Sequence, residues 1–214
     1  MKSVIAFSFV NFYASLMAQA LFAMGLLLTY QGPAVAQTAD STDSDTSAVV
    51  FMYHRFGEDS LPSTNIRINQ FESHIAELSS GGYHVLPIPE IISALREERS
   101  LPNRTVGITI DDGFRSVYTQ AFPRLREAGF PFTVFIATDG IDSGNKNLMN
   151  WDQIRELAAH GVTIGVHTAS HLHMADSTMS KNREDIVRSN ARLYEELGYR
   201  PGMFAYPYGE SGLG

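Results

Sequence analysis

Short apolar runs alternate with amphipathic segments along most of this chain, and that alternation constrains its fold more than any other feature. The runs are rich in β-branched and aromatic residues, which is typical of strands. We expect strands at 49–53, 84–86, 105–110, 132–137, 162–166 and 203–206. We expect helices at 69–80, 89–97, 116–128, 150–160 and 181–197. Nearly continuous apolar strands separated by helices predict an α/β fold, in which helices cover a parallel sheet.

Capping residues indicate where two of these helices begin. Asn69 precedes Glu72, and Asn150 precedes Gln153, with the spacing of a capping box. Gly198 is typical of the residue that follows a helix, so we expect the last helix to end there.

The first 36 residues contain one charged side chain, Lys2, and are mostly apolar over 4–30. A basic start, an apolar stretch and small residues at 34–36 predict a signal peptide over 1–36. An uncleaved N-terminal anchor is the alternative, because about 20 apolar residues span a bilayer. Both predict an exported protein, periplasmic or extracellular, with no membrane contact beyond its N-terminal segment. Residues 37–48 are small, polar and acidic and predict a flexible linker, followed by one domain at 49–214.

Composition excludes several classes of function. The chain has no Cys, which excludes a disulfide framework, a thiolate metal site and a Cys nucleophile. Its formal net charge is −7 and it has no basic stripe, so we expect no nucleic-acid partner.

Three short stretches lie at the carboxyl ends of predicted strands, at 109–113, 167–171 and 204–209. In α/β folds the carboxyl ends of parallel strands are where active sites are built. Asp111 and Asp112 are adjacent carboxylates, which repel each other and favour a nearby cation. His167 and His171 can present two imidazoles to one metal ion, and His173 offers a third at a different spacing.

Each stretch alone has an ordinary interpretation: a turn, a surface histidine cluster, or the end of a strand. Together they provide one Asp and two His ligands with open positions for water and substrate. Such a set suits Zn²⁺ and also accepts Co²⁺, Ni²⁺ or Fe²⁺. The second Asp is then free to act as a base, which predicts a metal-dependent hydrolase.

The same stretches resemble the polysaccharide deacetylase family, the NodB homology domain of carbohydrate esterase family 4. The segment 109–113 resembles the motif T-[FY]-D-D-G, with Ile110 at the aromatic position. The segment 167–171 matches H-[ST]-x-x-H, and 205–208 aligns with R-x-P-[YF]. Residues 52–55 look like the opening strand of many bacterial members, so the resemblance covers roughly 49–210.

The resemblance implies a fold, a site and an activity. The fold would be a distorted (β/α) barrel of parallel strands. Asp111 would be the general base that takes a proton from the attacking water, and the backbone N–H of Tyr208 would stabilise the oxyanion. The implied metal ligands are Asp112, His167 and His171, and the implied substrate-binding residues are His54, Pro207, Tyr208 and Trp151.

The implied reaction removes N-acetyl groups from a polysaccharide that contains N-acetylglucosamine, such as poly-N-acetylglucosamine, peptidoglycan or a chitin-like polymer. Hydrolysis of acetyl esters, as on xylan, is an alternative within the same fold. A catalytically inactive carbohydrate-binding remnant is another. For His54 a buried, hydrogen-bonded role is the alternative, and for Trp151 it is packing at the rim of the barrel.

Two departures from the family pattern bear on these expectations. The Arg of the third motif is Ala205, and Arg55 or Arg115 could replace its ion pair with the base. The later motifs, which supply an apolar pocket wall and a His that protonates the leaving amine, have no match before Gly214. We therefore expect a barrel that is incomplete at the C-terminus, as in a truncated chain.

Overall fold

The computed structural model describes residues 47–210. The predicted signal peptide, nearly all of the predicted linker and the last four residues lie outside the described part. No helix within 47–210 combines the length and apolarity that crossing a bilayer requires.

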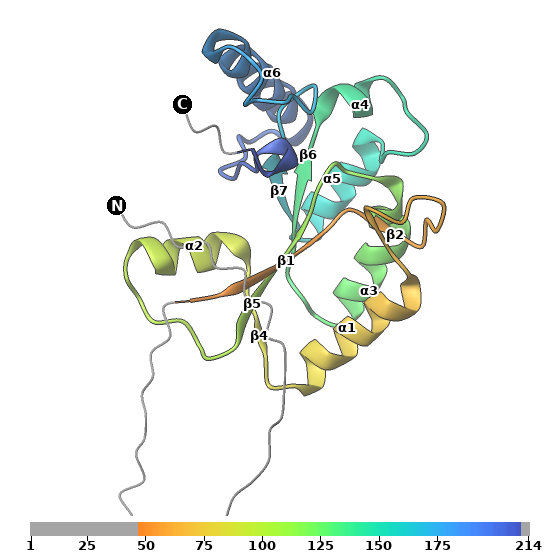
Figure 1. Ribbon diagram of the computed structural model, residues 1–214, viewed down its shortest axis with the longest axis vertical. Helices are drawn as coiled ribbons and strands as arrows, with labels where there is room; N and C mark the ends of the chain where they lie inside the picture. The colour runs from red at the N-terminus through yellow and green to blue at the C-terminus, as the bar shows by residue number, and fades with distance from the viewer. Residues whose placement is uncertain (1–46, 211–214) are drawn as a thin grey trace, which may run out of the picture. The chain divides into compact units, whose positions relative to one another are not determined.

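A parallel sheet forms the centre of the described residues (Figure 1). Its strands are paired in the order β1-β5-β6-β7, and β4 also pairs with β5. The strands are β1 (Val49–Tyr53), β4 (His84–Val85), β5 (Thr105–Ile110), β6 (Thr133–Ile136) and β7 (Thr163–Val166). The predicted parallel α/β architecture is confirmed, and within 47–210 these strands form an open sheet with β1 at its edge.

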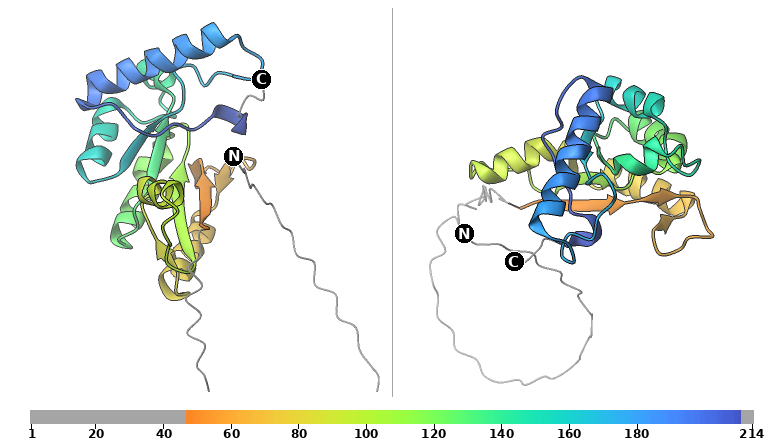
Figure 2. Two further views of the ribbon diagram at one scale, coloured as in Figure 1. Left: turned by 90° about the vertical axis from the view of Figure 1, so that its left-hand side faces the viewer. Right: turned by 90° about the horizontal axis from the view of Figure 1, so that it is seen from above.

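Helices cover both faces of this sheet. They are α1 (Ile68–Ser80), α2 (Ile88–Arg96), α3 (Phe122–Glu127), α4 (Thr138–Asp142), α5 (Trp151–Ala159) and α6 (Met179–Leu197). Figure 1 shows α1, α3 and α5 on one side of the strands and α2 on the other, and the two additional views in Figure 2 agree. The main core lies between the strands and the first group, where side chains such as Ile108, Leu125 and Leu157 are buried.

α2 packs closely against the second face of the sheet near the amino ends of the strands. Near the carboxyl ends of the strands, this face is hollow. Gly107 allows this approach, because a Cβ atom there would lie 2.4 Å from Cδ1 of Ile88. Further along the strands, Thr109, Phe135 and His167 line a cavity instead of meeting a helix. Strand alternation therefore puts the polar residues that follow β5 and β7 on the side of the cavity.

Several predicted elements are corrected by the structure. The segment 203–206 does not form a strand; it contributes one bridge, between Phe204 and Val166. The first helix begins after Arg67, which is extended, so Asn69 lies inside the helix and is not its cap. By contrast, Asn150 and Gln153 form the predicted capping box of α5.

Other elements have no prediction in the sequence. The two-residue strands β2 (Arg55–Phe56) and β3 (Asn65–Ile66) pair with each other, and α4 follows β6 directly. The predicted helix at 116–128 begins as a π-helical turn at Val117–Ala121 before it continues as α3. Gly198 ends α6 in the left-handed conformation, as predicted.

Candidate metal centre

The two adjacent carboxylates sit where β5 ends. The N–H of Asp111 donates to the carbonyl of Tyr53 at 2.9 Å, which extends the parallel pairing of β5 with β1 by one residue. The chain then turns, with φ of 72° at Asp112 and 81° at Gly113. A positive φ is uncommon for a residue with a side chain and marks a constrained site. Because of this turn, the side chains of Asp111 and Asp112 leave the edge of the sheet in different directions.

The two histidines lie on the segment that follows β7. The N–H of His167 donates to the carbonyl of Ile136 at 3.0 Å, and its Nδ1 lies 2.9 Å from the carbonyl oxygen of Ala205. Two residues of this segment are left-handed, Thr168 with φ of 60° and His171 with φ of 53°. This backbone directs Nε2 of both imidazoles toward the end of β5.

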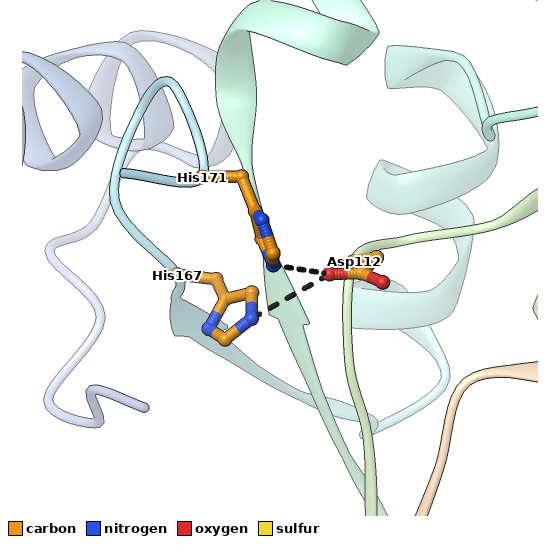
Figure 3. Close-up of side chains that lie close together, drawn as sticks. All are labelled: Asp112, His167 and His171. Carbon is orange, nitrogen blue, oxygen red and sulfur yellow. Dashed lines mark ion pairs between the residues drawn. The ribbon is translucent and has the colours of Figure 1, made fainter. Parts of the chain in front are cut away.

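Asp112, His167 and His171 converge on one point. Figure 3 shows the two imidazoles directed toward the Asp112 carboxylate. Oδ1 of Asp112 lies 3.0 Å from Nε2 of His171 and 3.5 Å from Nε2 of His167. The ligand atoms of all three residues lie within 4.8 Å of one another.

These residues fit a divalent metal ion. Asp112 Oδ1 is buried and has no hydrogen-bond partner of acceptable geometry, which is costly for a carboxylate oxygen that holds no cation. Two imidazole nitrogens and one carboxylate oxygen are a donor set typical of zinc and related metals. The structure therefore brings together the three ligands that the sequence predicts.

The electrostatic surroundings of the two carboxylates differ. Burial, with a smaller contribution from the Asp112 charge, raises the pKa of Asp111 to about 7. Burial also opposes ionisation of Asp112, but His171 and the other imidazoles outweigh it and hold the pKa of Asp112 below its usual value. Burial lowers the pKa of His167, which favours the neutral imidazole that binds metals. Asp112 is thus suited to bind a cation, and Asp111 to exchange a proton near neutral pH.

A cavity of about 600 Å³ opens beside this group. Among the residues with predicted roles, its wall contains Asp111, Asp112, His167, His171, His54 and Tyr208. A second hollow of about 270 Å³ borders Asp112 and His171 from the side of α4. The structure therefore gathers the predicted metal ligands, the predicted base and two of the predicted substrate-binding residues around one space.

Two predicted substrate-binding residues are not part of the cavity wall. Pro207 is buried and begins the 3₁₀ turn at Pro207–Gly209 that carries Tyr208. Trp151 lies on α5, where its Nε1–H donates to Asp142 at 2.7 Å and the Arg192 guanidinium covers its ring. The indole packs against the main core, in keeping with the alternative that we gave for it.

His173 does not join the metal group. Its Nδ1 lies 3.1 Å from a Glu210 carboxylate oxygen, and its ring stacks on Tyr208 with 3.6 Å between centroids. The predicted pair of ligands is therefore His167 with His171, and the alternate spacing is not used.

Neither candidate arginine braces Asp111. Arg55 lines the cavity, but it pairs with Glu58 at 2.8 Å and lies over the ring of Phe114. Arg115 is exposed and directed to the carbonyl of Lys146. Within 47–210 no arginine forms an ion pair with Asp111, so the ion pair of the third-motif Arg has no replacement there.

Sequence reasoning missed the carbonyl of Ala205, which accepts a hydrogen bond from His167. A backbone acceptor has no side-chain signature. The position of Ala205 beside a predicted strand end was the signal available, and it indicates proximity but not a hydrogen bond.

Comparison with known proteins agrees with this geometry. The sequence profile of the family described as polysaccharide deacetylase matches residues 98–212, more than half of the chain. The poly-β-1,6-N-acetyl-D-glucosamine N-deacetylase of Staphylococcus epidermidis is 27% identical over 189 residues, covering 76% of this chain and 65% of the relative. The protein of the same name from Escherichia coli K12 is 25% identical over 188 residues, covering 69% of this chain and 28% of the relative.

A solved structure is also similar to this chain. The structure of IcaB from Ammonifex degensii superposes with a TM-score of 0.65 and 33% identity, covering 75% of this chain and 74% of that one. The chain spans less than two thirds of the length of the two curated relatives.

Proposed function

Because the chain belongs to the polysaccharide deacetylase family, we propose that it removes N-acetyl groups from a polysaccharide containing N-acetylglucosamine. The observation that carries the proposal is the convergence of Asp112, His167 and His171 beside Asp111 on one cavity. Hydrolysis of an acetamide needs an activated water, a stabilised oxyanion and a proton for the leaving nitrogen. The cavity wall contains a candidate for each of these tasks.

Asp112, His167 and His171 would hold the metal, and we propose Zn²⁺, with Co²⁺ or Ni²⁺ as substitutes. A divalent cation there would supply Lewis-acid polarisation of the acetamide carbonyl. The residues contribute the geometry: the Ala205 carbonyl orients His167, and the turn at Asp112 aims its carboxylate at both imidazoles.

Asp111 is the proposed general base. Its side chain is buried at the cavity wall and receives no hydrogen bond from the described residues, so its oxygens are free for water. With the pKa of its carboxyl raised to about 7, it holds an abstracted proton more strongly than an ordinary aspartate. Asp111 would take the proton from the attacking water as the bond to the acetyl carbon forms.

Tyr208 and His54 would complete the site. The N–H of Tyr208 has no backbone acceptor within the described residues, and its residue is left-handed with φ of 59°, as expected for a turn that presents an N–H group. His54 is the cavity-lining imidazole outside the metal group, so we assign it substrate binding and proton transfer to the departing amine. The products would be acetate and a sugar with a free amine.

The names of two relatives support a substrate class. Both are named poly-β-1,6-N-acetyl-D-glucosamine N-deacetylases, and we propose a polymer of that kind for this chain. We also propose that the chain is exported by the segment 1–36, because this segment has the composition of a signal peptide.

Acetate release from defined oligosaccharides tests the proposal. Zn²⁺-loaded full chain is incubated with a β-1,6-linked N-acetylglucosamine oligomer, a chitin oligomer and acetylated xylan, with Asp111→Asn as the matched control for contaminating activity. We expect acetate from the β-1,6-linked oligomer, and a decrease of at least about 100-fold in the variant. Acetate from xylan alone would indicate an esterase, and no acetate from any substrate would support the inactive remnant.

A further inference from the structure

The segment between the two histidine ligands has a backbone that needs external support. Thr168 and His171 both adopt positive φ, at 60° and 53°. Residues with side chains rarely adopt this conformation unless neighbouring groups enforce it. The hydrogen bond from the N–H of Leu172 to Oγ1 of Thr168, at 3.0 Å, spans the segment but does not tie it to the rest of the fold.

Asp185 ties this segment to α6. Its side chain is buried, and Oδ1 accepts from the N–H groups of Ala169 at 2.7 Å and Ser170 at 3.0 Å. Oδ2 accepts from the hydroxyl of Ser170 at 3.0 Å. One carboxylate thus fixes the two consecutive peptide groups that lead into His171.

A closed ring of contacts holds Asp185 in turn. Nη2 of Arg188 donates to Oδ2 of Asp185 at 2.8 Å, and the same guanidinium pairs with Asp139 of α4. The N–H of Asp139 donates to the carbonyl of Ala169 at 2.9 Å, which returns to the segment between the histidines. Both the N–H and the carbonyl of Ala169 are therefore fixed, so its peptide planes cannot rotate freely. This ring connects the segments that follow β6 and β7 with α6.

We propose that Asp185 is a positioning residue for the metal centre, which sets the direction of the His171 imidazole by fixing the peptide groups of Ala169 and Ser170. The inference rests on the proposed metal site, and it assigns to α6 a role in metal affinity. Asp185 does not line the cavity, so it acts through His171 and not on the substrate. Outer groups of this kind commonly change metal affinity by about 10- to 100-fold when they are removed.

A matched pair of substitutions separates positioning from helix stability. Asp152 and Arg155 on α5 form an i,i+3 ion pair like that of Asp185 and Arg188, and Asp152 is exposed away from the site. The variants are Asp185→Ala, Asp185→Asn and the control Asp152→Ala, each made in the full chain. The measurements are the Zn²⁺ dissociation constant by chelator competition, and the visible spectrum of the Co²⁺-loaded protein.

We expect Asp185→Ala to weaken Zn²⁺ binding by about 10- to 100-fold and to change the Co²⁺ spectrum. Asp185→Asn keeps one acceptor oxygen for the two N–H groups, so it should recover part of this loss. Asp152→Ala should leave both readouts as in the wild type.

Several results would overturn the inference. Wild-type affinity and an unchanged Co²⁺ spectrum in Asp185→Ala would show that the ring stabilises the fold without positioning His171. If that variant does not fold, wild-type affinity in Asp185→Asn would overturn the inference in its place. If the wild type does not bind Zn²⁺, the proposed metal site and the inference are both overturned. If the wild type binds Zn²⁺ and Asp185→Ala binds it equally well, only the inference is overturned.

Discussion

Nδ1 of His167 lies 2.9 Å from the carbonyl oxygen of Ala205. A carbonyl can only accept, so Nδ1 carries the hydrogen and Nε2 is the free nitrogen that faces Asp112. The stretch that follows Met203 therefore determines the tautomer of a proposed metal ligand through its main chain. Alanine at position 205 keeps this function, although it lacks the side chain that the family pattern has there.

His171 and His173 offer a direct comparison of a proposed metal ligand with a neighbouring imidazole. His171→Ala removes one of the three converging ligands, whereas His173 is bound to Glu210 and stacked on Tyr208. We expect His171→Ala to weaken Zn²⁺ binding by at least about 100-fold and His173→Ala to change it by less than about threefold. Chelator competition on both variants measures this, and a larger loss in His173→Ala than in His171→Ala would show that the metal group is assigned to the wrong histidine.

Asp111 should destabilise the metal-free protein at alkaline pH. Its carboxyl has a folded-state pKa of about 7, above the ordinary value of 3.8, so the folded state binds the proton more tightly than the unfolded state does. The resulting loss in the free energy of unfolding is absent below pH 4, grows as the pH rises and is complete above pH 7. Asp111→Asn removes it, so the free energy of unfolding at pH 8 should rise by roughly 2–4 kcal/mol.

The control for this prediction is the same comparison at pH 3.5, where the wild-type carboxyl is mostly protonated in both states and the two proteins should have nearly equal stability. Urea unfolding in the presence of a chelator provides both measurements. A variant that is no more stable than the wild type at pH 8 would contradict the raised pKa.

Gly165 in β7 is required by close packing next to the metal centre. A Cβ atom there would lie 2.4 Å from Cδ1 of Phe135 and 3.3 Å from the carbonyl oxygen of Met203. Gly165→Ala should therefore lower the free energy of unfolding by about 1–3 kcal/mol. Gly202→Ala is the matched control, because no atom lies within 4 Å of the Cβ position there. Similar stability for the two variants would mean that β7 adapts without strain.

Trp151 should not respond to substrate. It is the only tryptophan in the chain, so the intrinsic tryptophan fluorescence of the protein reports on it alone. Asp142 and Arg192 engage the indole away from the cavity. Titration with a β-1,6-linked N-acetylglucosamine oligomer should leave the emission unchanged, and a saturable change would support the predicted role in sugar binding.

The sequence predicts those parts of the fold in which periodicity extends over several residues. The strands predicted at 105–110 and 162–166 are nearly continuous runs rich in β-branched residues, and α5 has a complete capping box, so these elements are identified correctly. The two-residue strands β2 and β3 and the five-residue α4 are too short to produce a periodic pattern. The segment 203–206 resembles a strand in composition, yet it contributes one bridge, to Val166, before the turn at Pro207–Gly209 begins.

The candidate site follows the same logic. One Asp and two His after strand ends indicate a metal site, and the resemblance to the family implies that the ligands are Asp112, His167 and His171, which the structure brings together. The groups that hold them, the Ala205 carbonyl and the Asp185 carboxylate, could not be predicted. One is main chain, and the other is an ordinary acidic residue on an amphipathic helix, where sequence alone favours an exposed position.

The metal content of the purified chain tests the central claim most directly. Zinc bound per chain is measured in the wild type, Asp112→Ala and Asp111→Asn, with acetate release from the same samples. We predict about one zinc ion per chain in the wild type, loss of both metal and activity in Asp112→Ala, and retention of metal without turnover in Asp111→Asn. Full metal content in Asp112→Ala would contradict the account.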